Sequence, residues 1–219
     1  MEGKKVQRYE FDRVIPESVG IPSKTIENVL DKLECSTNTE PHGIMIMRHG
    51  KVCAEGWWSP YAAGVPHSLW SITKTFTATA VGILYTDGRI NLDDLIIEYF
   101  PEYATIDTGD YIKKLRIRDA LAMSSGKAEV RCDTASWARH YFEIPIMDEP
   151  GTKFEYSCED THILMGIVQN VTGQSLEEFL KLRLFEKIGI DANNIKWVYL
   201  PDGSVVGAGG LFATTEDSL

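Results

Sequence analysis

Residues 67–78 have the sequence HSLWSITKTFTA, which places a serine and a lysine three positions apart, at Ser71 and Lys74. Positions three apart share one face of an α-helix. A serine hydroxyl is a weak nucleophile until a neighbouring group takes its proton, and a lysine can do so when burial or a nearby cation lowers its pKa. A helix N-terminus also stabilises developing negative charge. The stretch therefore predicts a nucleophilic serine at the start of a helix over about 71–85.

The same serine–lysine spacing occurs a second time, in residues 124–127 (SSGK). There Gly126 ends a short expected helix, so Lys127 is expected to point away from Ser124. The first pair follows a turn and opens a long helix, which is the context that nucleophilic serines of this kind need. For the first pair, the alternative is a helix-capping serine beside a solvated lysine.

Composition and charge limit the classes of protein that are possible. The chain has 219 residues, of which 43% are hydrophobic. That content is enough for a core in one large domain and too high for a disordered chain. The formal net charge is −10, from 22 basic and 32 acidic side chains. Phosphates would be repelled, so no nucleic-acid partner is expected.

No targeting or membrane segment is evident in the sequence. The charged N-terminal residues are not followed by an apolar stretch, and the longest apolar-rich run, residues 78–85, is too short to span a bilayer. The cysteines are scattered without a C-x-x-C pair, so neither a zinc site nor a disulfide framework is expected; they are Cys35, Cys53, Cys132 and Cys158. The expectation is a reduced, cytoplasmic protein without a membrane span.

Hydrophobic periodicity and turn residues predict an α+β fold. Two strands joined by a tight turn at 49–50 are expected at 43–47 and 52–58, and a second hairpin at 196–200 and 204–206. Besides the helix at 71–85, helices are expected at 22–35, 93–100, 117–123, 136–142, 159–171 and 175–187. The last of these opens with a capping box formed by Ser175 and Glu178.

The C-terminal residues 214–219 have the pattern of a helix start. Thr215 is expected as the N-cap, with two acidic residues in the first turn, where the helix dipole favours them. A helix start without a helix, and a sheet of only two hairpins with an open edge, lead us to expect further strands beyond Leu219.

Several stretches together resemble the class C β-lactamase-related serine hydrolases, which include β-lactamases, D-alanyl-D-alanine carboxypeptidases, esterases and 6-aminohexanoate-dimer hydrolases. Besides 67–78, these stretches are GRINLDD at 88–94, IRDALAMSSG at 117–126, PGTKFEYS at 150–157 and GAGGLFATTED at 207–217. The resemblance implies a β-lactamase/transpeptidase-like fold, an antiparallel sheet flanked by helices. Residues 1–219 would be one incomplete domain: strands and nucleophile helix at 16–87, a helical subdomain at 88–189, and the start of the return to the sheet at 190–219.

The same resemblance assigns roles within the site. Ser71 would be acylated, Lys74 and Tyr156 would manage the protons, and Ser124 would be a structural helix end. No metal or organic cofactor is implied, and the expected partner is a small ester, amide or peptide-like substrate. The sequence does not predict an oligomeric state.

Two departures from the family pattern qualify this assignment. Cys158 stands where many relatives have asparagine, and a thiol is a weak donor and acceptor. This change argues against a dedicated β-lactamase more than against hydrolysis. The family's Lys- or His-x-Gly strand, which supplies an oxyanion-hole donor, would fall beyond Leu219, and losing one such donor commonly costs about 10²–10³ in rate. The alternative is therefore a catalytically impaired, truncated remnant or a binding module of the same fold.

Overall fold

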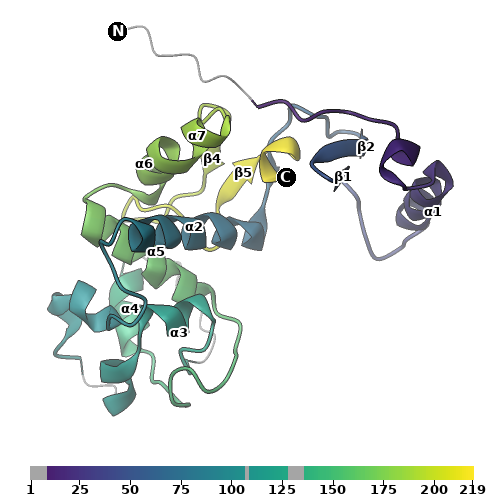
Figure 1. The fold of residues 1–219 in the computed structure, drawn as a ribbon. Helices are drawn as coiled ribbons and strands as arrows, with labels where there is room; N and C mark the ends of the chain where they lie inside the picture. Colours follow the sequence, from purple (N-terminus) through teal and green to yellow (C-terminus); the bar gives the residue numbers. More distant parts are fainter. Residues whose placement is uncertain (1–8, 107–108, 128–135) are drawn as a thin grey trace, which may run out of the picture. The chain divides into compact units, whose positions relative to one another are not determined.

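A computed structural model describes residues 9–106, 109–127 and 136–219. Figure 1 shows its helices and strands. The chain divides into two compact units. The first contains Met1–His67, Ile188–Ile195 and Phe212–Leu219, and the second contains Ser68–Lys187 and Lys196–Leu211.

The first unit contains the predicted β-hairpin. Strand β1 (Gly43–Arg48) pairs antiparallel with β2 (Lys51–Trp57). His49 and Gly50 form the turn with φ angles of 53° and 74°. Positive φ at both central residues is what a type I′ hairpin turn requires. The hairpin is therefore confirmed, and Arg13 adds an isolated parallel bridge to Val52 of β2.

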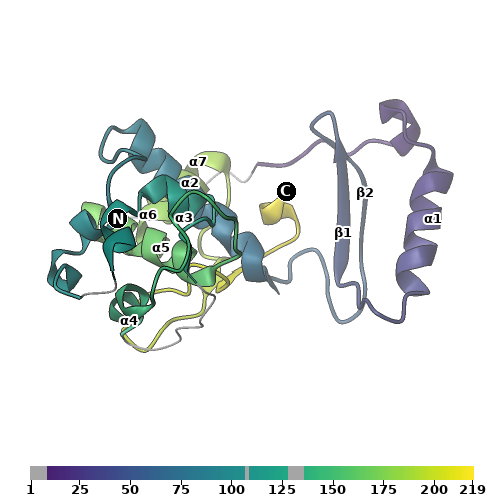
Figure 2. The ribbon, with the colours of Figure 1, turned by 90° about the horizontal axis from the view of Figure 1, so that it is seen from below.

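The predicted N-terminal helix is also confirmed, as α1 (Ser23–Glu34) after a 3-10 turn at Pro16–Val19. Figure 2 shows α1 alongside the hairpin. Ile26 is buried and Leu30 is half-buried, whereas Val29 is 41% exposed. The apolar stripe of this helix is thus narrower than the sequence suggests. A hollow of about 270 Å³ remains between the helix and the hairpin.

The second unit is built around two long helices, α2 (Thr73–Thr86) and α5 (Cys158–Thr172), which pack side by side (Figure 1). Gly166 of α5 permits a close approach of two aromatic rings. A Cβ atom at this position would lie 2.7 Å from the Trp137 ring and 2.8 Å from the Phe100 ring. The predicted helices at 71–85 and 159–171 are confirmed, apart from shifted starts.

Shorter helical elements complete the unit. They are α3 (Ile117–Leu121), α4 (Trp137–Glu143), α6 (Leu176–Leu180) and α7 (Glu186–Ile188), with 3-10 turns at Ile96–Tyr99, Pro101–Tyr103 and Asp110–Lys114. The capping box of Ser175 and Glu178 is confirmed. The π-helical turn Lys181–Phe185 interrupts the helix expected over 175–187. Leu180 and Phe185, five positions apart, are both buried, which this wider turn allows.

The helix predicted over 93–100 is reduced to the 3-10 turn Ile96–Tyr99. The backbone N–H of Ile96 donates to the Leu115 carbonyl at 2.9 Å. The preceding residue forms an antiparallel bridge with the segment before α3. Pairing with this segment uses backbone groups that would otherwise begin an α-helix.

The second predicted hairpin is present in a reduced form. Tyr199 and Val205 form an isolated bridge, the Leu200 N–H donates to the Ser204 carbonyl at 2.7 Å, and the Val206 N–H donates to the Val198 carbonyl at 2.8 Å. The second sheet has the strand order β3-β5-β4, formed by His67–Ser68, Leu211–Ala213 and Lys196–Trp197. A Cβ atom on Gly210 would lie 2.9 Å from the Val206 carbonyl oxygen and 3.2 Å from that of Val198. Glycine at this position therefore lets the chain before β5 lie against the hairpin, where the Val198 N–H donates to the Gly210 carbonyl at 2.9 Å.

The C-terminal residues Glu216–Ser218 form a 3-10 turn. Thr215 is its N-cap residue, as expected, but the Thr215 side chain makes no capping hydrogen bond. The Thr214 hydroxyl accepts from the Asp217 backbone N–H at 3.2 Å and donates to the Asp217 carboxylate at 2.6 Å. The Thr215 hydroxyl instead accepts from the Trp57 indole at 3.1 Å. Side-chain capping has moved by one residue because β2 offers Thr215 another partner.

Helices and antiparallel strands within one chain confirm the α+β class. Across residues 9–106, 109–127 and 136–219, no helix combines the length and the apolar character needed to cross a bilayer. The thiols of Cys35, Cys53 and Cys158 are free, and Cys132 lies outside the described residues.

Candidate active site

The serine predicted as the nucleophile lies in a turn just ahead of α2. Ser71 is in the middle of the 3-10 turn Trp70–Ile72 and precedes the first helical residue by two positions. Trp70 has a φ of 45°, a backbone conformation that bulky residues rarely adopt and that costs of order 1–3 kcal/mol. The N–H of Leu69 donates to the Leu211 carbonyl at 2.9 Å. A strand contact before the turn and the helix after it thus hold Ser71 on a strained backbone.

Lys74, in the first turn of α2, directs its ammonium group toward this serine. The Lys74 side chain is buried, with an exposed fraction of 9%. Its Nζ donates to Ser71 Oγ at 3.2 Å, to the Ala208 carbonyl at 2.6 Å and to Cys158 Sγ at 3.4 Å. An ammonium group has three hydrogens, so these acceptors account for all of them. The arrangement places a fixed positive charge beside the serine oxygen.

Tyr156, at the end of the loop before α5, completes the group. Its hydroxyl donates to Ser71 Oγ at 2.5 Å, the short end of the range for bonds between hydroxyl groups. The Lys74 ammonium lies 5.0 Å from the centre of the Tyr156 ring. Tyr156 is exposed, at 40%, so a molecule in solvent can reach it. The structure thus brings together all three residues that the sequence predicts as catalytic.

Hydrogen bonds from α2 to the segment before β5 fix the geometry of the lysine site. The Thr73 hydroxyl accepts from the Leu211 N–H at 3.2 Å, and the Thr77 hydroxyl donates to the Gly207 carbonyl at 2.7 Å. Both threonines are completely buried. The Ala208 carbonyl, which lies between these anchor points in sequence, is thereby held at the Lys74 ammonium. Sequence reasoning missed this residue because its contribution is a backbone carbonyl.

Cys158 occupies the position that the resemblance implied, next to the lysine. It is the first residue of α5, it is partly buried, and its sulfur accepts a weak hydrogen bond from Lys74. Asp160, two residues further along α5, has a structural role: its N–H is capped by Ser157 Oγ at 3.0 Å. Within the part of the chain that the structure describes, no group of three or more His, Cys, Asp or Glu side chains is arranged to bind a metal ion.

The second serine–lysine pair has separate partners. Ser124 Oγ donates to the Asp119 carbonyl at 3.1 Å. Lys127 is buried, and its Nζ donates to the carbonyls of Tyr141 at 2.8 Å and Ile144 at 2.6 Å. Burial lowers the pKa of Lys127 to about 8, against the opposing attraction of the Asp160 carboxylate. Burial also raises the pKa of Asp160 to about 6.

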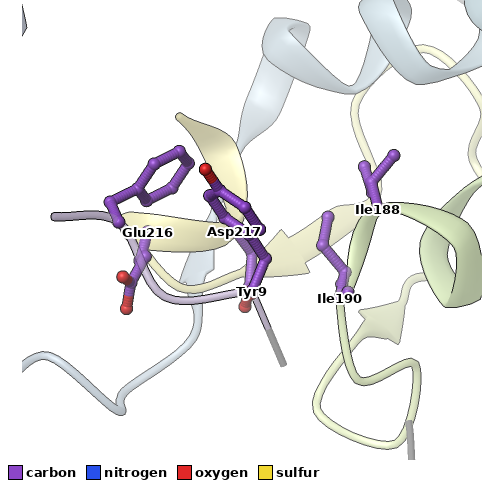
Figure 3. A pocket seen from close by; sticks show the side chains of 7 residues that line it. Tyr9, Ile188, Ile190, Glu216 and Asp217 are labelled. Atoms are coloured by element: carbon purple, nitrogen blue, oxygen red, sulfur yellow. The ribbon is translucent and has the colours of Figure 1, made fainter. Parts of the chain in front are cut away.

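A pocket of about 370 Å³ lies in the first unit and is shown in Figure 3. Its lining combines apolar side chains with two carboxylates from the C-terminal turn; the residues are Tyr9, Phe11, Ile188, Gly189, Ile190, Glu216 and Asp217. None of the three predicted catalytic residues contributes to this lining. The pocket is therefore distinct from the group around Ser71.

Comparison with known proteins identifies the family. Residues 42–218 match the family model for beta-lactamase. The chain belongs to the beta-lactamase family. It is 26% identical over 165 residues to the 6-aminohexanoate-dimer hydrolase of Paenarthrobacter ureafaciens, an alignment that covers 67% of this chain and 42% of that protein. It is 28% identical over 208 residues to an Escherichia coli (strain K12) protein provisionally named as a D-alanyl-D-alanine carboxypeptidase, covering 86% of this chain and 47% of that protein.

The fold is shared with solved structures of this family. A class C beta-lactamase in complex with cefoxitin superposes with a TM-score of 0.72 at 18% identity, covering 92% of this chain and 63% of that one. The resemblance inferred from the sequence motifs and the β-lactamase/transpeptidase-like fold are therefore confirmed. The chain spans less than half the length of the two curated relatives.

Proposed function

We propose that this chain is a serine hydrolase that forms an acyl-enzyme on Ser71 and then hydrolyses it. The observation that carries the proposal is the convergence of two groups on one oxygen. Ser71 Oγ accepts from the Tyr156 hydroxyl at 2.5 Å and from the Lys74 ammonium at 3.2 Å. A nucleophile within hydrogen-bonding reach of its proton acceptor is the arrangement that acyl transfer requires.

The hydrogen bonds of Lys74 indicate which of the two partners of Ser71, Lys74 or Tyr156, receives the serine proton. All three ammonium hydrogens are directed at acceptors, and an ammonium group has no lone pair to receive a proton. Tyr156 is therefore the base: for this step its oxygen has released its own proton, so that the hydrogen bond to Ser71 Oγ is reversed and the serine donates. Lys74 acts as the electrostatic partner and aligns the serine.

The reaction then follows from these roles. Tyr156 takes the Oγ proton as Oγ bonds to the substrate carbonyl carbon, and the tetrahedral intermediate collapses with loss of the leaving group. That group receives the proton back from Tyr156. A water molecule then attacks the acyl-enzyme and gives one proton to Tyr156. The second tetrahedral intermediate collapses with cleavage of the bond to Ser71 Oγ, which takes that proton back from Tyr156, and the carboxylic acid product is released. No step consumes an oxidant, a reductant or a metal ion.

We propose a small ester, amide or peptide-like molecule as the substrate. The thiol of Cys158 borders Lys74 and is a weak hydrogen-bonding group. It forms weaker hydrogen bonds with a substrate amide than an asparagine side chain would. This supports a hydrolase that is not specialised for β-lactams, and p-nitrophenyl esters are the first substrates to test.

Active-site labelling tests the proposal. A fluorophosphonate probe should add to the wild-type chain once, and peptide mapping should place the adduct on Ser71. Ser71→Ala should abolish labelling, and the matched variant Ser124→Ala should keep it. Equal labelling of Ser71→Ala and the wild type would refute the proposal. Labelling of Ser71 without turnover of p-nitrophenyl esters would identify a catalytically impaired form.

A further inference from the structure

The second serine–lysine segment lies under the loop that carries Tyr156. The Glu155 N–H donates to the Met123 carbonyl at 2.8 Å, and the Gly151 N–H donates to the Ser124 carbonyl at 2.8 Å. The Met147 N–H donates to the Gly126 carbonyl, also at 2.8 Å. Backbone groups of 123–126 therefore anchor the loop at three points, and the contact from Glu155 is adjacent to Tyr156.

The close fit between this turn and the loop requires the glycine of the segment. Gly126 has a φ of 76°, and a Cβ atom there would lie 2.1 Å from the Asp148 carbonyl oxygen. Any other residue would push the two backbones apart. Met123 also has a positive φ, of 51°. The turn is thus held in an uncommon conformation at the two ends of the loop contact.

Lys127, which follows the 123–126 turn, is buried and also contacts the loop. It forms an isolated antiparallel bridge with Ile146, near the start of the loop. Its ammonium donates to the Tyr141 and Ile144 carbonyls at the end of α4, where intrahelical donors are lacking. The ammonium also lies 4.6 Å from the centre of the Tyr141 ring. Lys127 therefore ties the end of α4, from which the loop departs, to the 123–126 turn.

The other end of the loop is connected to the same cluster. The Tyr141 hydroxyl donates to Asp160 Oδ1 at 3.0 Å, and both groups are buried. Asp160 lies in the first turn of α5, and its N–H is capped by Ser157, the residue that follows Tyr156. Three hydrogen bonds thus connect Lys127 to the end of the loop: Lys127 bonds the Tyr141 backbone carbonyl, the Tyr141 side chain bonds the Asp160 carboxylate, and the Asp160 backbone bonds Ser157.

We infer that Lys127 is a positioning residue for Tyr156: it fixes both ends of the 144–157 loop and so holds the phenol against Ser71. A buried ammonium costs several kcal/mol in desolvation unless it is fully hydrogen-bonded. A lysine at this position therefore stabilises the loop through the acceptors it brings together. The inference rests on the proposed function, because it assigns Lys127 a role that acts through Tyr156.

Amide hydrogen exchange tests the physical link without depending on activity. Lys127→Met keeps the volume and removes the donors. We expect the amides of Gly151 and Glu155 to exchange at least about tenfold faster in this variant, whereas an amide in the middle of α5, such as that of Ile167, stays unchanged. The matched control is Thr172→Val, which removes hydrogen bonds to Val168 and Gln174 at the far end of α5 and should leave the loop amides unaffected.

A double-mutant cycle tests the catalytic consequence. Displacing a reacting group by about 1 Å can cost 10²-fold in rate, so Lys127→Met should slow acylation of Ser71 at least about tenfold, with KM within about twofold. In a Tyr156→Phe background the same substitution should have less than about a twofold effect, because the group it positions has been removed. A purely structural role would give equal losses in both backgrounds.

The outcomes separate this inference from the proposed function. If Ser71 of the wild-type chain is not labelled, the proposed function fails, and the exchange of the loop amides alone decides the inference. Unchanged exchange, or equal losses in both backgrounds of a labelled chain, would overturn it. If Lys127→Met does not fold, Tyr141→Phe replaces it. That variant removes only the hydroxyl that reaches Asp160, and it should produce the same pattern with a smaller amplitude.

Discussion

The segments 71–74 and 124–127 share the spacing Ser-x-x-Lys, yet they differ in backbone conformation and in whether the lysine reaches the serine. In the first, a 3-10 turn leads into a long helix, and the lysine ammonium lies 3.2 Å from the serine oxygen. In the second, Gly126 with φ of 76° turns the chain, and the lysine donates to carbonyls of α4. Spacing alone therefore does not define a catalytic pair. The backbone conformation between the two residues does.

Replacing each serine by alanine should give the largest difference between the two segments. Ser71→Ala removes the nucleophile and should lower kcat for p-nitrophenyl acetate by at least about 10³-fold, since loss of a nucleophile removes the covalent route altogether. Ser124→Ala loses one hydrogen bond to the Asp119 carbonyl, worth about 1 kcal/mol of stability, and should keep most of the activity. Steady-state kinetics and thermal unfolding of both variants measure the contrast. Comparable losses of kcat would show that the first segment is not the catalytic one.

Tyr156→Phe should give the next largest effect. It removes the hydroxyl that donates to Ser71 Oγ at 2.5 Å and leaves the ring in place. General base catalysis contributes typically 10²–10⁴-fold, so kcat should fall by about that factor with little change in KM. The melting temperature should stay close to that of the wild type, since the ring is 40% exposed. A kcat within twofold of the wild type would assign the base role to another group.

The strong signals in the sequence located several elements correctly. Regular periodicity with clear end signals predicted α1, α5 and the capping box of Ser175, because each depends on local interactions. Ser71 and Lys74 were linked by their spacing on one helix, but Tyr156 lies in a separate motif far along the chain, and no periodicity would have linked it to Ser71. Recognition of the motif, and not local physics, made that part of the prediction possible.

The features that were missed depend on tertiary contacts. The Ala208 carbonyl binds Lys74 only because two threonines of α2 hold the neighbouring backbone. The second hairpin is shortened, and Gly210 lets the chain before β5 lie against it. Lys127 would ordinarily be placed in solvent, since lysines are almost never fully buried unless paired. Backbone acceptors carry no side-chain signal, so none of these contacts could be inferred from residue types.

The buried ammonium of Lys127 should make the free energy of unfolding depend on pH. Its pKa is about 8 in the folded chain, against a model-peptide value of 10.5. Between these values the unfolded chain binds more protons, so the free energy of unfolding rises with pH, by up to about 1.4 kcal/mol per pH unit. Urea unfolding from pH 7 to 10.5 should show this rise in the wild type and not in Lys127→Met. Parallel curves for the two proteins would mean that the ammonium is solvated.

Between about pH 4 and 6 the free energy of unfolding should change with pH in the opposite direction, because of Asp160, which lies near Lys127. The pKa of Asp160 is raised to about 6 from 3.8, mainly by burial. Between these values the folded chain binds more protons, so its stability falls as the pH rises from about 4 to 6. Asp160→Asn should flatten this part of the curve, because the amide does not titrate. A fall of the same size in Asp160→Asn would assign the effect to other carboxylates.

The smallest expected effect concerns Cys158, whose sulfur is a hydrogen-bond partner of Lys74. Its sulfur lies 3.4 Å from the Lys74 ammonium, and an asparagine there would offer a stronger acceptor to the lysine and an additional donor to a substrate amide. Cys158→Asn should therefore raise the rate of nitrocefin hydrolysis relative to that of p-nitrophenyl acetate, by less than about tenfold, since one neutral hydrogen bond contributes about 1 kcal/mol. Cys158→Ser is the matched control: it keeps the small size and changes only the atom facing the lysine. A gain that is equal for both substrates, or equal in the serine variant, would show that the side chain at 158 acts on Lys74 and not on the choice of substrate.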